Sequence, residues 1–140
     1  MESAHARYET AFDGRDAPFA FVDLDAMRSN AGEMLARAGG KPIRVASKSV
    51  RCRALLDAIE QRDERFRGLM TFTLEESLWL AQPDMLLAYP TTDRGALARM
   101  GEDGPVLMVD SVDHLDLIDS ASGPGSCLTR STCDRSDRQP

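Results

Sequence analysis

Lys48 is the residue of this sequence best suited to covalent chemistry. It ends the run Ile43 to Lys48 (IRVASK) and is one of two lysines in a chain whose Lys and Arg residues total 17. A lysine amine can form a Schiff base with a carbonyl compound, whereas an arginine guanidinium cannot. A lysine at this position in an otherwise arginine-rich chain therefore indicates a nucleophile or a covalent cofactor anchor.

The segment around Lys48 is basic, although the whole chain carries a formal net charge of −6. Residues 41–53 contain five cations and no Asp or Glu. The positive charges of Arg44 and Arg51 would disfavour the protonated, cationic form of the Lys48 amine. Together with a helix N-terminus near Ser49, the same two arginines could receive a phosphate. The same pattern also fits a solvated surface patch that contains an exposed lysine, so both interpretations stay open.

Short apolar runs alternate with helical patterns along most of the chain, which predicts repeated βα units. Helix starts are expected at Asp25, Thr73, Thr91 and Ser111, residue types that cap helix N-termini. This alternation predicts an α/β fold with a parallel sheet, either doubly wound or part of a (βα)8 TIM barrel. The predicted strands are Phe19 to Val22, Ile43 to Ala46, Gly68 to Phe72, Met85 to Tyr89 and Val106 to Val109.

The length of the chain limits how much of a barrel it can form. A full (βα)8 barrel takes about 250 residues, so about five βα units in 140 residues would make a partial barrel. We expect an N-terminal extension over residues 1–16 and the partial barrel over 17–119. Residues 120–140 lack apolar periodicity and are rich in turn formers, which predicts an unstructured tail, from a chain cut short or read out of frame.

The predicted strand before Lys48 has two different faces. Ile43 and Val45 share one face, whereas Arg44, Ala46 and Lys48 share the other, because side chains alternate along a strand. The branched residues suit contact with covering helices. The small and cationic residues suit a cavity at the carboxyl end of the strand, where α/β proteins place their sites.

Two further residues are expected at the same edge of the sheet. Tyr89 ends the fourth predicted strand, and Asp110 follows the fifth, so each could contact a cofactor or substrate. Their alternative roles are a packed aromatic for Tyr89 and helix capping for Asp110. Asp23 and Asp25 could form a carboxylate pair, although capping by Asp25 is the favoured interpretation.

The remaining residues with reactive or aromatic side chains are assigned structural roles. His114 is expected on the surface of the last helix, His5 in a frayed terminus, and Trp79 in a helix-packing core. Three cysteines without a paired short spacing predict free thiols rather than a disulfide framework or a zinc site. We assign no metal ligand.

Composition excludes several classes of protein. The acidic net charge argues against nonspecific nucleic-acid binding, which requires a basic face. No stretch approaches the roughly 20 apolar residues of a membrane span, and the N-terminus lacks a signal-peptide pattern. We therefore expect a cytoplasmic protein of one domain without a nucleic-acid or membrane partner.

Much of the chain resembles a known family. The stretch APFAFVDLDAMRSNAGEMLARAGGKPIRVASKSVRC is similar to the opening of the alanine racemase N-terminal-domain family, the fold-type III pyridoxal phosphate barrels. Within it, the D-threonine aldolase-like, or amino-acid deaminase/aldolase, branch is most similar. The similarity continues through FRGLMTFTLEESLWLA, DMLLAYPTTD and LMVDSVDHLDLID and covers roughly residues 17–119.

The resemblance implies a role for Lys48 and a class of reaction. Lys48 would be the lysine that holds pyridoxal phosphate, and the remaining strands and a β-domain of the family would be missing. The racemases have a phosphate-binding tyrosine four residues after the lysine, where this chain has Cys52, so an aldolase-like activity fits better. D-threonine aldolases also use a divalent metal, but its ligands lie in a part of their longer chain without a counterpart here.

Two functional hypotheses follow. The first is a pyridoxal phosphate enzyme fragment acting on a small amino acid through a Lys48 Schiff base, with Arg44, Arg51, Tyr89 and Asp110 as further cofactor contacts. We expect little or no turnover from this chain as it stands. The second is a non-catalytic α/β module that binds an anionic ligand or a partner protein. Exposed strand edges can pair with those of a second copy, so a homo-oligomer is compatible with both hypotheses.

Overall fold

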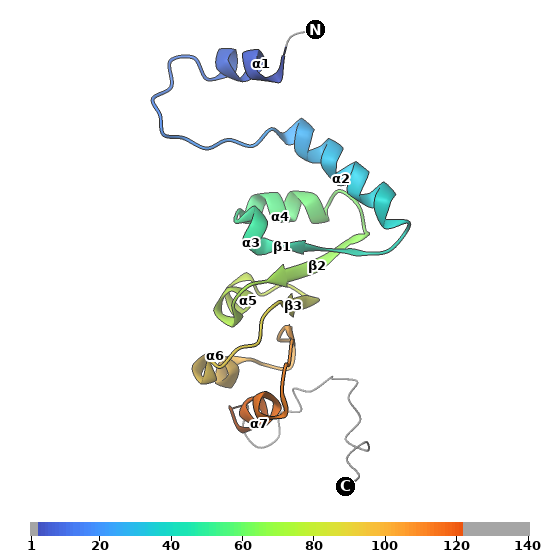
Figure 1. Cartoon of the computed structure of the whole chain (residues 1–140), viewed down its shortest axis with the longest axis vertical. Coiled ribbons are helices and arrows are strands. Elements are labelled where there is room, and N and C mark those ends of the chain that lie inside the picture. The colour runs from blue at the N-terminus through green and yellow to red at the C-terminus, as the bar shows by residue number, and fades with distance from the viewer. Residues whose placement is uncertain (1–2, 122–140) are drawn as a thin grey trace.

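The computed structural model describes residues 3–121, which form a parallel β-sheet with helices around it (Figure 1). The strands pair in the order of the sequence, and every neighbouring pair is parallel. The predicted α/β class and parallel sheet are therefore confirmed. The strands are β1 (Ile43–Ala46), β2 (Phe66–Thr71), β3 (Met85–Leu87) and β4 (Val106–Leu107).

The helices follow the strands along the chain, as the repeated βα pattern predicts. Thr73 begins a helix as expected, because its hydroxyl accepts a hydrogen bond from the backbone N–H of Glu76 at 3.1 Å. In the described residues the helices are α1 (Ala4–Ala11), α2 (Leu24–Ala38), α3 (Ser47–Val50), α4 (Arg53–Glu60), α5 (Leu74–Leu80), α6 (Arg94–Arg99) and α7 (Val112–Ala121).

The main core lies on one face of the sheet. Val45, Leu69 and Met85 pair in one row across β1, β2 and β3 and are 8%, 0% and 4% exposed. Each buried side chain of this size stabilises the fold by about 1.5–3 kcal/mol relative to an exposed one. The row packs against residues of α2, α4 and α5, namely Ala31, Leu35, Leu56 and Leu80.

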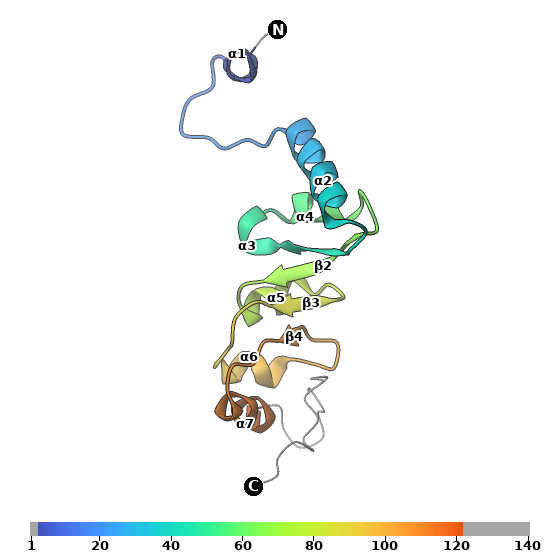
Figure 2. The same ribbon diagram turned by 45° about the vertical axis from the view of Figure 1, so that its right-hand side comes forward.

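A second cluster continues the core on the same side, since Leu87 lies two residues after Met85 in β3. Figure 2 shows α6 and α7 at the β4 end of the sheet. Leu87 of β3 is 1% exposed, and Leu107 of β4, its register partner, packs against the cluster. The helical members come from α5, α6 and α7, together with the residue that ends α6: Leu74, Ala96, Leu97, Met100 and Ile118.

The opposite face of the sheet is not covered in this way. Ala46, Met70, Leu86 and Val106 form the adjacent row across all four strands. Met70 is 37% exposed and Val106 is 53% exposed, and neither core cluster contains a residue of this row. Within residues 3–121, the sheet therefore has one helix-covered face and one open, largely apolar face.

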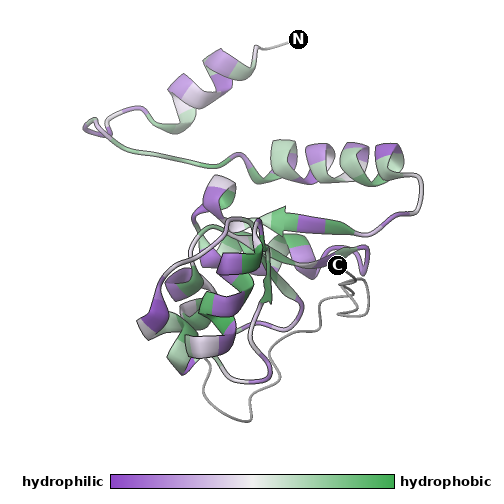
Figure 3. Cartoon of the chain, turned by 60° about the horizontal axis from the view of Figure 1, so that its bottom comes forward, coloured by the Kyte–Doolittle hydropathy of each residue, from purple (hydrophilic) through white to green (hydrophobic). Residues whose placement is uncertain are grey.

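The first predicted strand, Phe19 to Val22, is wrong. These residues are extended but unpaired, and Phe19, Phe21 and Val22 are 46–51% exposed. Figure 3 shows this largely hydrophobic segment running apart from the sheet. Its rings pack instead near α1, with the Phe12 and Phe21 centroids 4.5 Å apart. The described chain thus has four strands rather than five.

The boundaries of the predicted segments also change. The N-terminal extension contains a helix, α1, which Ser3 caps by accepting a hydrogen bond from the Ala6 N–H at 3.2 Å. The last helix, α7, continues to Ala121 and so passes the predicted boundary at residue 119. Residues 122–140, the rest of the predicted unstructured tail, lie outside the described residues.

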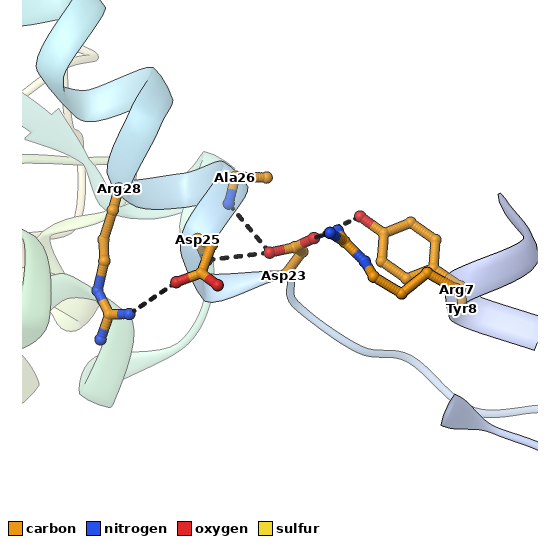
Figure 4. Close-up of polar contacts among 6 residues, drawn as sticks. All are labelled: Arg7, Tyr8, Asp23, Asp25, Ala26 and Arg28. Atoms are coloured by element: carbon orange, nitrogen blue, oxygen red, sulfur yellow. Dashed lines mark hydrogen bonds and ion pairs between the residues drawn. The ribbon is translucent and has the colours of Figure 1, made fainter. Parts of the chain in front are cut away.

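Asp23, rather than Asp25, caps α2. Its Oδ1 accepts hydrogen bonds from the backbone N–H groups of Asp25 and Ala26 at 2.9 and 3.0 Å (Figure 4). Its other oxygen accepts from the Tyr8 hydroxyl at 2.5 Å and from Arg7 at 2.7 Å. The Tyr8 hydrogen bond, followed by that of the Ala26 N–H, holds the pKa of this carboxyl below its usual value. The contacts of Asp23 therefore serve the junction of α1 and α2, while Asp25 pairs with Arg28 at 3.1 Å.

A bulge at Gly68 fixes the register of β1 and β2. Ile43 pairs with Phe66, whereas Val45 pairs with Leu69, so β2 has one extra residue between them. Gly68 has φ +74°, in the left-handed region that favours glycine. A Cβ there would lie 2.0 Å from the Asp84 carbonyl oxygen, so only glycine allows this close approach.

We predict that Gly68→Ala destabilises the fold by roughly 2–4 kcal/mol, because left-handed strain adds to overpacking against the Asp84 backbone. Urea unfolding measures the change. Gly32→Ala is the matched control, since Gly32 lies inside α2 with no atom within 4 Å of an added Cβ. It should stabilise the protein by about 0.5–1 kcal/mol. Equal effects of the two substitutions would contradict the bulge argument.

We predict that Tyr8→Phe raises the pKa of Asp23 towards the ordinary aspartate value, because the strongest donor is lost. A lowered folded pKa stabilises the α1–α2 junction above the ordinary pKa, and this contribution disappears as the pH falls through the lowered value. Carboxyl carbon NMR titration follows Asp23 directly. Arg7→Gln is the comparison and should cause a smaller rise, since the charge of Arg7 is a lesser cause. A larger rise in Arg7→Gln would contradict this ranking.

Candidate functional site

Lys48 lies at the carboxyl edge of the sheet, in the single-turn helix α3 that follows β1. The preceding residue, Ser47, is 1% exposed, and its hydroxyl donates to the Met70 carbonyl oxygen of β2 at 3.3 Å. This contact holds the start of α3 against the neighbouring strand, while the Lys48 side chain is exposed. The turn therefore presents an amine at the edge where α/β folds place ligands.

The Lys48 amine meets two aromatic side chains. Its Nζ donates a hydrogen bond to the Tyr89 hydroxyl at 3.1 Å. It also lies 5.1 Å from the ring centroid of Phe72 and 5.2 Å from that of Tyr89, within cation–π range. The two rings contact each other edge to face, with centroids 5.0 Å apart and planes at 82°. Side chains that follow three different strands thus converge on one amine.

The strand register explains this convergence. Ala46 of β1 pairs with Met70 of β2, so Lys48 and Phe72 each lie two residues beyond the same row. The Ala88 N–H donates to the Thr71 carbonyl oxygen at 2.9 Å, which extends the pairing of β2 and β3 as far as the residue before Tyr89. The cluster is therefore a consequence of the sheet, and we call Lys48, Phe72 and Tyr89 the amine cluster.

Phe72 was not among the residues predicted for the site. The sequence pattern predicts Phe72 only as the end of a strand, yet its ring is 46% exposed and lies 5.1 Å from the Lys48 amine. Its backbone N–H donates to Glu76 Oε2 at 2.9 Å, which fixes it at the start of α5. The signal that could have identified it is its position, because it ends the strand that neighbours the strand of Lys48.

The two arginines predicted to accompany Lys48 lie in different places. Arg51 follows α3 with φ 49°, and its Nε donates to the Lys48 carbonyl oxygen at 3.1 Å, so it stays beside the amine cluster. Arg44 instead binds Asp84, with its Nη2 2.5 Å from the carboxylate and its Nη1 on the backbone carbonyl. Asp84 precedes β3, whereas Tyr89 follows it. The structure therefore takes Arg44 to the amino edge, away from Lys48.

Asp110 lies beyond β4 at the carboxyl edge, but it contacts His114 rather than the amine cluster. Its Oδ1 is 3.4 Å from His114 Nδ1, and the Asp110 side chain is 65% exposed. The prediction that His114 is a surface residue is wrong, because its side chain is only 5% exposed. The helical pattern did not reveal this burial, since it depends on the loop after β3, whose Thr91 carbonyl lies 2.8 Å from Nε2.

Trp79 is also placed differently from the prediction. It is 66% exposed on α5, and the Arg53 guanidinium lies 5.6 Å from its ring centroid. Leu78 and Leu80 pack on the covered face instead, so the apolar stripe of α5 excludes Trp79. Cys52 is an exposed free thiol, as expected, whereas Cys127 and Cys133 lie outside the described residues.

A cavity of about 580 Å³ lies at the other edge of the sheet, where β3 and β4 begin. Asp84, Glu102 and Asp103 line it, so its charge is opposite to that needed for a phosphate. Residues 3–121 contain no group of three or more His, Cys, Asp or Glu side chains arranged to hold a metal ion. None of the helices in that range has the length and apolar character needed to cross a bilayer.

The amine cluster thus brings together, within the described chain, a lysine amine, an acceptor hydroxyl and an aromatic wall. Such a group can form a covalent bond to a carbonyl compound and hold a flat ring beside it. No protein-family model matches this chain, and neither a curated protein nor a solved structure matches it. The geometry of the cluster is therefore the basis for assigning a function.

Proposed function

We propose that Lys48 holds pyridoxal phosphate as a Schiff base and that the chain belongs to an enzyme acting on a small amino acid in the cytoplasm. The observation that carries this proposal is the amine cluster at the carboxyl edge, with Lys48 Nζ 3.1 Å from the Tyr89 hydroxyl. The sequence resemblance to the alanine racemase N-terminal-domain family, closest to its D-threonine aldolase-like branch, supports the same role for Lys48.

The form of the sheet supports a partial (βα)8 barrel as its architecture. A doubly wound sheet has helices on both faces, whereas both core clusters here lie on one face. Barrels also pair their strands in the order of the sequence, as β1 to β4 do. In this proposal the open face with Met70 and Val106 would be part of the barrel interior.

The residues of the amine cluster fit a pyridine ring bearing an aldehyde and a phosphate. The exposed Lys48 amine is accessible to the aldehyde, and the half-exposed rings of Phe72 and Tyr89 provide an apolar wall beside it. Arg51, whose Nε donates to the Lys48 carbonyl oxygen, is the cation proposed for the phosphate, since Arg44 is held by Asp84 at the other edge. Asp110 lies at the same edge of the sheet as Lys48 and is a second contact in this proposal.

When bound, pyridoxal phosphate supplies an electron sink for negative charge that develops at the α-carbon of an amino acid. This chain would contribute orientation and proton handling. The Tyr89 hydroxyl holds the Lys48 amine at a fixed distance from the aromatic wall, and Lys48 is the group that can accept or return a proton at that position. Carbon–carbon cleavage, deamination and racemisation are all compatible with these roles.

We predict that pyridoxal phosphate gives the purified protein a visible Schiff-base absorbance and that borohydride then fixes the adduct on Lys48. The chain has two lysines, so Lys41→Ala is a matched control that removes the other exposed one. The Lys48 peptide should carry the label in the wild type and in Lys41→Ala, and Lys48→Ala should lose it. Tyr89→Phe should retain labelling at Lys48 with weaker binding, because one hydrogen bond to the amine is absent.

Equal labelling of Lys41, Lys48 and the N-terminal amine would contradict the proposal. Labelling unchanged in Lys48→Ala would contradict it as well. Either result would favour the alternative of a non-catalytic α/β module that binds an anionic ligand or a partner protein through its basic segment. Far-UV circular dichroism of each variant establishes that a loss of labelling is not a loss of folding.

A further inference from the structure

His114 links the two loops that follow β3 and β4 at the carboxyl edge. Its ring lies on α7 and is 5% exposed. Nε2 is 2.8 Å from the Thr91 carbonyl oxygen, in the loop after β3, and Nδ1 is 3.4 Å from Asp110 Oδ1, in the loop after β4. A single imidazole thus contacts both segments that carry Tyr89 and Asp110.

The chemistry of these partners determines where the ring carries its hydrogens. A carbonyl oxygen can only accept, so Nε2 must be the N–H that donates to Thr91. In a neutral ring Nδ1 then presents a lone pair, and residues 3–121 supply no hydrogen-bond partner for this buried atom. Asp110 Oδ1, a carboxylate oxygen that can only accept, lies 3.4 Å from it. Two acceptor atoms would therefore lie 3.4 Å apart with no hydrogen between them.

We propose that His114 is a positioning residue that clamps these two loops together in its doubly protonated, cationic form. A hydrogen on Nδ1 makes the 3.4 Å contact with Asp110 an ion pair, while Nε2 keeps its bond to Thr91. The Asp110 side chain is 65% exposed and can rotate to shorten the contact. Loss of the Nδ1 hydrogen leaves the Thr91 bond in place and removes the charged contact with Asp110. The loop after β4 is then held less tightly rather than released, because Asp110 Oδ1 keeps its hydrogen bond from the Ser111 hydroxyl at 3.3 Å.

Other charged groups near α7 are engaged elsewhere. The helix packed against it is α6. Arg94 of α6 donates to the Ser120 hydroxyl at 3.0 Å, and Arg99 pairs with Glu75 of α5. Asp93, which caps α6, accepts from the Ala96 N–H at 2.9 Å. On α7 itself Asp113 precedes His114 and is exposed, so Asp110 is the charged partner that the ring contacts.

The clamp matters for the proposed cofactor edge because Thr91 is two residues from Tyr89. Tyr89 holds the Lys48 amine, and Asp110 is a proposed second contact, so one ring sets the spacing between them. Its significance for the enzyme rests on the proposed function. The clamp itself does not rest on that function, because the ring contacts are made by Thr91, Asp110 and His114 alone.

Ring nitrogen NMR tests the clamp in the full chain without added pyridoxal phosphate. The two histidines are well separated in environment, because the His5 side chain is 82% exposed and serves as an internal reference. We expect His114 to carry hydrogens on both nitrogens at acidic pH and on Nε2 alone after it becomes neutral. A neutral form with the hydrogen on Nδ1 would overturn the proposal.

Amide protection factors of Asp93 and His114 measure whether the clamp holds the loops. In the wild type these factors should fall about five- to tenfold once Nδ1 loses its hydrogen, as expected for the loss of one hydrogen bond. Asp110→Asn should reverse this trend, because its amide can donate to the neutral Nδ1. His114→Gln, which keeps a donor for Thr91 but does not titrate, should abolish it.

The same trend in Asp110→Asn as in the wild type would overturn the proposal. Asp110 is exposed, so this variant keeps the core and gives a result even if His114→Gln fails to fold. A failure of Lys48 labelling would refute the cofactor and leave the clamp standing. A neutral His114 ring with its hydrogen on Nδ1 in the nitrogen NMR would refute the clamp and leave the cofactor proposal standing. The two proposals can therefore fail separately.

Discussion

Val45, Leu69 and Met85 pack in one row beneath α2, α4 and α5, and this row holds three parallel strands in register. The side-chain period of a strand is two, so once these residues face the helices the next residues face the opposite side. Register also fixes where each strand ends. Lys48 and Phe72 lie side by side only because Ala46 and Met70 are paired, and a slip of one residue would separate the amine from the ring.

The two edges of the sheet have different physical roles. At the amino edge, Arg44 reaches Asp84 past Gly68, whose missing Cβ makes room for both, so a cation that could have served chemistry stabilises the start of β3 instead. At the carboxyl edge the contacts are looser, since Phe72 and Tyr89 are each 46% exposed. This division is typical of parallel α/β folds, in which one edge secures the strands and the other carries the reactive groups.

Periodicity was sufficient to predict β1 and the capped start of α5, because both depend on local alternation and a side chain three residues away. Periodicity failed where contacts with residues distant in the sequence determine the structure. Phe19 to Val22 has the composition of a strand, but Phe12 and Tyr8 provide its contacts. The helical pattern predicts His114 at the surface, whereas its ring is buried and bonded to the Thr91 carbonyl. Arg44 shares a strand face with Lys48 but lies at the opposite edge of the sheet. Lys48 and Tyr89 could be predicted because both follow strands, whereas pairing with Phe72 required the register.

The open face of the sheet bears differently on the cofactor binding and on the catalysis proposed for this chain. Electrostatic contacts strengthen when water is excluded, and enclosed sites owe much of their effect to this exclusion. The amine cluster instead borders a face on which Met70 and Val106 are 37% and 53% exposed. Water can therefore reach the contacts of Lys48, and the proton steps proposed for it would lack a low-dielectric surrounding. In the proposed function, the geometry that would hold the cofactor depends on the strand register, whereas the environment needed for turnover would depend on covering the open face.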